Sequence, residues 1–145
     1  MLQWAVEVHN GPVAIRYGRG GDRSYHDSAF ADGSVYCHQA GSDVTLITYG
    51  TLIDNAMDVA RILAEKGIHA TVLRLLKVAP LPVEDVCRYA LPGKPVVVME
   101  EAQANCGIGE ALAYEIRQRM DVPVSTINLG DQYVTHGNIN QLYAH

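Results

Sequence analysis

Short apolar segments rich in β-branched residues alternate with amphipathic segments of helical period along most of the chain. The strand-like segments are 44–49, 70–76, 95–99 and 124–128, and the helical segments between them are 52–65, 83–91 and 107–120. Parallel strands need a crossover connection, which a helix normally provides. The series therefore predicts an α/β fold, with a mainly parallel sheet, right-handed crossovers and helices on both faces.

Details within this series predict how single elements lie. Residues 35–39 alternate between apolar and polar side chains, which is typical of a half-exposed edge strand, whereas residues 44–49 are almost continuously apolar or β-branched, as in a strand covered on both faces. Thr51 is expected to cap the helix that follows, and Gly67 to end it. Residues 139–144 are expected to form a final helical turn or two.

The first 34 residues do not fit the series. Residues 1–9 have the pattern of a helix that stops at Asn10-Gly11-Pro12, and residues 13–17 resemble a short strand. The next stretch is rich in Gly, Asp and Ser and reads as a linker. A chain that begins within an apolar-faced helix is expected to continue an earlier domain. We therefore divide it into the end of a preceding domain (1–20), a linker (21–33) and a second domain (34–145).

Composition excludes several classes of function. The 145 residues include 11 Lys and Arg against 16 Asp and Glu, and this acidic balance argues against a nucleic-acid partner. No run approaches the roughly 20 apolar residues of a membrane span, and the N-terminus does not resemble a signal peptide. Three cysteines without C-x-x-C spacing indicate neither a disulfide framework nor a zinc site. We expect a cytoplasmic protein.

Candidate chemistry gathers after the strands, where parallel sheets bind ligands. The segment 105–109 precedes a helix and could hold an anion, although a glycine turn packed closely on the sheet is favoured because no Lys or Arg follows. Glu100 and Glu101 could act as an acid–base pair. Neighbours at a strand end point in opposite directions, so we favour one solvated carboxylate and one that accepts hydrogen bonds from the following loop.

Single residues elsewhere carry weaker signals. Cys106 precedes a helix but has no partner base nearby, so an unused thiol is favoured over a reactive one. His136 is either a substrate contact or a hydrogen-bonding loop residue. Tyr17 and Tyr49 are interpreted as packing or interface residues. Arg16 and Arg19 could bind a phosphate or carboxylate through their guanidinium groups, or could be solvated.

Four segments resemble the 1-deoxy-D-xylulose-5-phosphate synthase family. Residues 11–20, GPVAIRYGRG, are similar to its G-P-x-A-I-R-Y-P-R-G segment, and residues 129–137, LGDQYVTHG, to its G-x-P-D-x-F-V-x-H-G segment. Residues 43–51 resemble the first strand and turn of the transketolase C-terminal domain, and residues 98–109 its V-E-E and G-G-x-G motifs. The last two are shared with transketolases and with the β subunits of 2-oxoacid dehydrogenases, whereas the first two favour the synthase.

The resemblance implies a three-layer α/β/α domain with a five-stranded sheet and one antiparallel edge strand. It also implies an enzyme that condenses pyruvate with glyceraldehyde 3-phosphate on thiamine diphosphate and Mg²⁺, releasing CO₂. The cofactors would bind in other domains of a homodimeric enzyme and not to this chain, whose first 20 residues would end the pyrimidine-binding domain. The chain alone would then be inactive.

The same resemblance implies site residues. The second arginine of the family's R-Y-P-R-G segment contacts the acceptor phosphate and aligns with Arg19, and we add Arg16 and His136 as further substrate contacts. Gly18 stands in place of the family's proline, and Cys106 in place of a glycine. A transketolase, a dehydrogenase β subunit and a free-standing assembly or anion-binding module remain alternatives.

Overall fold

A computed structural model describes residues 2–18, 33–131 and 133–137. Its centre is a five-stranded sheet in the order β1-β3-β2-β4-β5. The strands are β1 (Val35–Gln39), β2 (Val44–Thr48), β3 (Ala70–Leu75), β4 (Val96–Met99) and β5 (Val124–Ile127). The edge strand β1 runs antiparallel to β3, and every other pairing is parallel. The predicted mostly parallel sheet with one antiparallel edge strand is confirmed.

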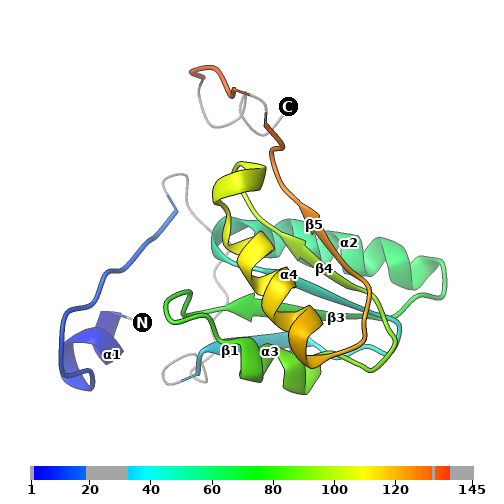
Figure 1. Cartoon of the computed structure of the whole chain (residues 1–145), viewed down its shortest axis with the longest axis horizontal. Coiled ribbons are helices and arrows are strands. Elements are labelled where there is room, and N and C mark those ends of the chain that lie inside the picture. Colours follow the sequence, from blue (N-terminus) through cyan, green and yellow to red (C-terminus); the bar gives the residue numbers. More distant parts are fainter. Residues whose placement is uncertain (1, 19–32, 132, 138–145) are drawn as a thin grey trace.

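Helices cover both faces of this sheet. The helices are α1 (Leu2–Glu7), α2 (Ile53–Glu65), α3 (Val83–Tyr89) and α4 (Ile108–Arg119), and the 3₁₀ turns are η2 (Gly50–Leu52) and η3 (Ala104–Cys106). Figure 1 shows α2 on one face and α3 with α4 on the other. Within the described residues, no helix is both long and apolar enough to cross a bilayer.

Alternation along the central strand divides the core in two. Leu46 packs with Ile53, Ala56 and Ala60 on the α2 face, whereas the fully buried Ile47 belongs to the larger cluster under α3 and α4. Because successive side chains of a strand point to opposite faces, a strand buried on both sides must be apolar throughout. The nearly continuous apolar run 44–49 indicates this arrangement.

Two local predictions are wrong. Residues 13–17 form no strand, because no other strand within the described residues pairs with them. The N-cap position of α2 is Leu52, one residue after the predicted Thr51. The Thr51 hydroxyl donates to Glu101 Oε1, at 3.2 Å. The predicted C-terminal helix 139–144, and the predicted linker apart from Gly33, lie outside the described residues.

Residues 2–18, called the arm below, comprise α1 and an extended segment beside the sheet domain (Figure 1). The apolar side chains of α1 are largely exposed: Leu2 by 70% and Val6 by 76%. One side chain of α1 contacts the sheet domain, where Lys77 Nζ lies 4.2 Å from the centre of the Trp4 ring. A cation over an indole face is an attractive contact, so this pair attaches α1 to the loop after β3.

Candidate functional site

The carboxyl ends of β2 and β4 bring Tyr49 and Glu100 together. These parallel strands pair Ile47 with Val98, so the same register two residues further places Tyr49 opposite Glu100. The Tyr49 hydroxyl donates a hydrogen bond of 3.2 Å to Glu100 Oε2. The strand ends are also joined by the buried Thr48 hydroxyl, which donates to the Met99 carbonyl at 3.0 Å.

Glu100 is a buried carboxylate at the start of a helix. Its side chain is only 3% exposed, and Oε2 also accepts the backbone N–H of Gly109, in the first turn of α4, at 3.0 Å. The unpaired N–H groups and the dipole of a helix N-terminus stabilise negative charge. Oε1 is buried and accepts no hydrogen bond from the described residues. The helix terminus therefore holds an anion that the protein itself supplies.

Two glycines make room for this carboxylate. A methyl group added at Gly107 would lie 2.5 Å from the Glu100 carboxyl carbon and 2.7 Å from Oε2. One added at Gly109 would lie 2.5 Å from Oε1. Neither glycine has a positive φ, so their role here is close approach and not backbone conformation.

The predicted difference between the environments of Glu100 and Glu101 is confirmed. Glu100 accepts a backbone hydrogen bond from the following loop and helix, whereas Glu101 is exposed and accepts the Thr51 hydroxyl. The glycine-rich turn packs closely against the end of β4, as predicted, and its specific partner there is the Glu100 carboxylate. The anion at the helix terminus is the carboxylate of Glu100 itself.

Tyr49 is half-buried, with its hydroxyl beside the Glu100 carboxylate. Burial raises the pKa of its hydroxyl above the ordinary value of 10.0, and the charge and hydrogen bond of Glu100 raise that pKa further. The positive charge of Arg16, on the arm, acts in the opposite direction.

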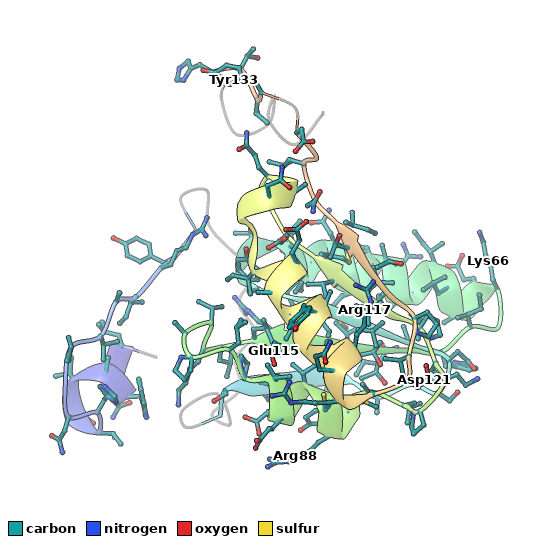
Figure 2. All side chains as sticks on the ribbon, viewed as in Figure 1. Lys66, Arg88, Glu115, Arg117, Asp121 and Tyr133 are labelled. Carbon is teal, nitrogen blue, oxygen red and sulfur yellow. The ribbon has the colours of Figure 1, made fainter. Side chains whose placement is uncertain are left out.

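The other predicted site residues are not gathered at this point. Arg19 lies outside the described residues, as does the side chain of Cys106. His136 is exposed, in a segment that projects from the molecule apart from the arm (Figure 1). Figure 2 shows the side chain of Tyr133, in the same segment, far from the sheet.

The loops that follow β4 and β5 are joined to each other. Leu129 N–H donates to the Ala102 carbonyl at 2.9 Å, Ala104 N–H donates to the Gly130 carbonyl at 3.1 Å, and the Asn105 amide donates to Asp131 at 3.1 Å. Within the ranges that the structure describes, no group of three or more His, Cys, Asp or Glu side chains could hold a metal ion. The site is thus a surface edge at which hydroxyl and carboxylate groups are joined by hydrogen bonds.

Comparison with known proteins shows the family and the fold to which this sheet domain belongs. Residues 33–145 match the family model described as "Transketolase, C-terminal domain". The chain belongs to this family. Among solved structures, the fold of this chain matches that of a split-gene transketolase described as an inactive beta4 tetramer, with a TM-score of 0.70. The two sequences are 23% identical, and the match covers 88% of this chain and 42% of the other. A transketolase mutant from Pichia stipitis matches with a TM-score of 0.59 and 16% identity, covering 80% and 16% of the two chains.

Similarity to curated relatives extends beyond the transketolase C-terminal domain into the arm. The 1-deoxy-D-xylulose-5-phosphate synthase of Desulforudis audaxviator is 36% identical over 94% of this chain. The synthase of Lysinibacillus sphaericus is 31% identical over 98% of it, and a subunit of the apulose-4-phosphate transketolase of Phocaeicola vulgatus is 31% identical over 92%. The chain spans 22%, 23% and 44% of the lengths of these three relatives.

Sequence reasoning misses the link between Tyr49 and Glu100. From the sequence, Tyr49 is interpreted as a packing or interface residue, because nothing adjacent to it suggests a hydrogen-bond partner. The signal is indirect: both residues directly follow strand segments of a parallel sheet. They meet because β2 and β4 are neighbours, and this strand order follows from the tertiary fold.

Proposed function

We propose that this chain is the C-terminal part of a thiamine-diphosphate-dependent transferase of the 1-deoxy-D-xylulose-5-phosphate synthase type. The complete enzyme would condense pyruvate with glyceraldehyde 3-phosphate and release CO₂, forming a precursor for isoprenoid synthesis. The observation that carries the proposal is the similarity to synthases over 94% and 98% of the chain, which includes the arm as well as the family domain.

In this proposal the chain has the domain organisation expected from its sequence. Residues 1–20 are the end of a pyrimidine-binding domain, residues 21–33 a linker and residues 34–145 the C-terminal domain. The exposed apolar side chains of α1 support this, since Leu2 and Val6 would be covered by the rest of their own domain. Thiamine diphosphate and Mg²⁺ would be bound by domains outside this chain.

The proposed role of the chain is to bind the acceptor phosphate and to assist dimer formation. Arg19 is the proposed phosphate contact, with Arg16 and His136 as further substrate contacts, because a guanidinium fork matches the geometry of a phosphate. The proposed compartment is the cytoplasm, where free cysteines such as Cys37 and Cys87 stay reduced.

The test is an Arg19→Ala substitution in an intact enzyme, for instance the Desulforudis synthase with its matching segment replaced by residues 1–145. The kcat/KM for glyceraldehyde 3-phosphate should fall at least tenfold, about 1.4 kcal/mol, because a charged contact is lost. The kcat/KM for unphosphorylated glyceraldehyde should stay within about twofold, since it lacks the phosphate. Arg88→Ala, on α3 far from the segment containing Tyr133 (Figure 2), is the matched control.

Two results would contradict the proposal. An equal loss with both acceptors would remove the phosphate role of Arg19. Thiamine-diphosphate-dependent CO₂ release from pyruvate by the 145-residue chain alone would show that no other domain is needed.

A second candidate is a transketolase-type enzyme that acts on a different phosphorylated sugar. The relative from Phocaeicola vulgatus favours it, because that protein is named as part of an apulose-4-phosphate transketolase and this chain spans 44% of it. The two candidates differ in the donor. Pyruvate consumption with CO₂ release supports the synthase, whereas transfer of a two-carbon unit from a ketose phosphate without CO₂ release supports the transketolase.

A further inference from the structure

The outer edge of β5 presents backbone groups that no described strand uses. β5 is the last strand in the sheet order, and among the described residues only β4 pairs with it. The carbonyls of Pro123 and Ile127 accept N–H groups from residues 96 and 100, so these two positions face β4. Backbone groups along a paired strand alternate between its two sides. The N–H and C=O groups of Val124 and Thr126 therefore point to the outer edge.

The two edges of the sheet differ in their protection against pairing. At the other edge, the register between β1 and β3 shifts between Cys37 and Gln39. Bulges of this kind, and charged side chains, are the usual means by which proteins keep an edge strand from pairing with another chain. β5 keeps a regular register with β4 and carries no charged side chain. It is therefore the edge better suited to accept a further strand.

A groove beside the β5 edge carries two opposite charges. Six residues of α4 and β5 line it: Glu110, Ala113, Arg117, Val124, Ser125 and Thr126. Glu110 and Arg117 are seven positions apart, so they lie on one face of α4, about 10.5 Å from each other along the helix. The Arg117 guanidinium donates to the Val124 carbonyl, and Figure 2 shows Arg117 between α4 and β5. Neither Glu110 nor Arg117 forms an ion pair with another described residue.

A second copy of this chain matches both the backbone edge and the two charges. A two-fold axis through Ser125 would make the two β5 strands antiparallel and place Val124 opposite Thr126 of the second copy. Each such pair can exchange both of its N–H···O bonds. The same axis reverses the direction of α4, so Arg117 of each copy meets Glu110 of the other. A peptide from another protein would need its own acid and base at this spacing.

Other exposed side chains at this edge fit the same two-fold arrangement. Ile127 is 57% exposed, and in this register it lies opposite the exposed Pro123 of the second copy. Tyr114 is 61% exposed and lies between Glu110 and Arg117 along the same face of α4. This places it near the axis, and aromatic side chains are enriched in protein interfaces. Apolar surface would thus be covered on both faces of the sheet.

We propose that two copies of this chain associate through their β5 edges, so that their five-stranded sheets become one continuous sheet and Arg117 of each copy pairs with Glu110 of the other. The inference gives a surface to the dimer role within the proposed function and rests on that role. It does not depend on the substrate, and its test needs no enzyme assay.

The first experiment measures the Kd of self-association of the 145-residue chain by sedimentation equilibrium, from about 1 µM to 1 mM. A monomer–dimer equilibrium is expected. Arg117→Glu and Glu110→Arg each place like charges opposite each other at two symmetric contacts, so each should raise the Kd at least about tenfold. The double variant restores opposite charges and should return the Kd to within about threefold of the original. Arg88→Glu, on α3, makes the same charge change elsewhere and is the matched control.

The second experiment locates the contact on the backbone by amide hydrogen exchange, followed by NMR below and above the Kd. The outward N–H groups of Val124 and Thr126 should exchange at least about tenfold more slowly in the dimer. The N–H of Ser125 faces β4 and is the internal control, with an unchanged rate. Thr126→Pro removes one outward N–H at a position where an edge strand tolerates proline, and it should raise the Kd at least about tenfold.

Several results would overturn the inference. A chain that stays monomeric at about 1 mM has no such contact. A Kd that ignores both charge reversals, or a double variant as weak as the single ones, would place the contact elsewhere. Unchanged exchange at Val124 and Thr126 in a dimer would exclude strand pairing. If circular dichroism shows that Thr126→Pro unfolds the domain, the charge series decides, because it leaves the backbone intact.

The outcomes for this contact and for the proposed function are separable. An intact enzyme that does not use pyruvate would remove the synthase activity and leave the β5 contact standing. A dimer that forms through another surface would remove the β5 contact and leave the synthase activity standing.

Discussion

The close approach of Gly107 to Glu100 predicts a substitution whose effect changes sign with its background. Gly107 has φ −81° and ψ 161°, values that alanine adopts without strain. The cost of Gly107→Ala therefore comes from the new methyl group, which would lie 2.5 Å from the Glu100 carboxyl carbon. The carboxylate must move, which weakens its bonds from Gly109 and Tyr49 without removing both; each intact bond is worth about 1.5–3 kcal/mol for a charged acceptor. We expect the free energy of unfolding to fall by about 2–4 kcal/mol.

The same substitution should be harmless once the carboxylate is gone. Glu100→Ala alone should destabilise by about 2–3 kcal/mol, because the first turn of α4 loses its acceptor. In that background the alanine at 107 meets no carboxylate, and it restricts the unfolded chain, which stabilises proteins by about 0.4–1 kcal/mol. Gly107→Ala is then expected to be neutral or stabilising.

Urea unfolding followed by far-UV circular dichroism measures all four proteins of this double-mutant cycle. The coupling between the two sites should be at least about 2 kcal/mol, well above the error of such a cycle. The adjacent, exposed Glu101→Ala is the control and should change stability by less than about 0.5 kcal/mol. Simple additivity of Gly107→Ala and Glu100→Ala would refute the close-approach explanation.

Three further predictions concern other parts of the domain. The pKa of the Asp43 carboxyl lies below 3.8, chiefly because the carboxylate accepts a hydrogen bond from His69 N–H. The stabilisation from this bond is therefore present above pH 3.8 and is lost as the pH falls through the folded pKa. Asp43→Asn should flatten the acid limb of a stability–pH curve measured by urea titrations. Gly41→Ala would place a methyl group 2.5 Å from the His69 carbonyl oxygen. The free energy of unfolding should fall by about 2–3 kcal/mol and lower the Tm. An unchanged Tm would contradict this packing. Burial raises the pKa of the Cys37 and Cys87 thiols, which lowers their reactivity in the folded protein. In a Cys106→Ser variant at pH 7, both thiols should therefore react with a disulfide reagent much faster in urea than in buffer. Equal rates in the two solutions would contradict their burial.

The fold is predictable because its signals are local. Segments such as 44–48 and 70–75 indicate buried strands by composition alone, and the split between Glu100 and Glu101 follows from strand alternation. The strand predicted at 13–17 is wrong for a related reason: its composition is strand-like, but a strand also needs a partner. The sequence of a segment does not show whether a neighbouring strand is available to pair with it.

The site is less predictable because its contacts join residues about 50 positions apart. The Thr51 hydroxyl donates to Glu101 and the Tyr49 hydroxyl to Glu100, in both cases between the ends of β2 and β4. Capping rules consider only the next turn of the chain and do not include such contacts. A strand order, once assumed, would have indicated both contacts.

The placement of the single tryptophan has a practical consequence for anyone who studies this protein by fluorescence. Trp4 lies on the arm, against Lys77, and not in either core cluster. Its emission will report release of α1, whereas circular dichroism will report melting of the sheet domain. If the arm detaches first, the two probes will give different midpoints, and a two-state fit to the fluorescence curve would describe the wrong event.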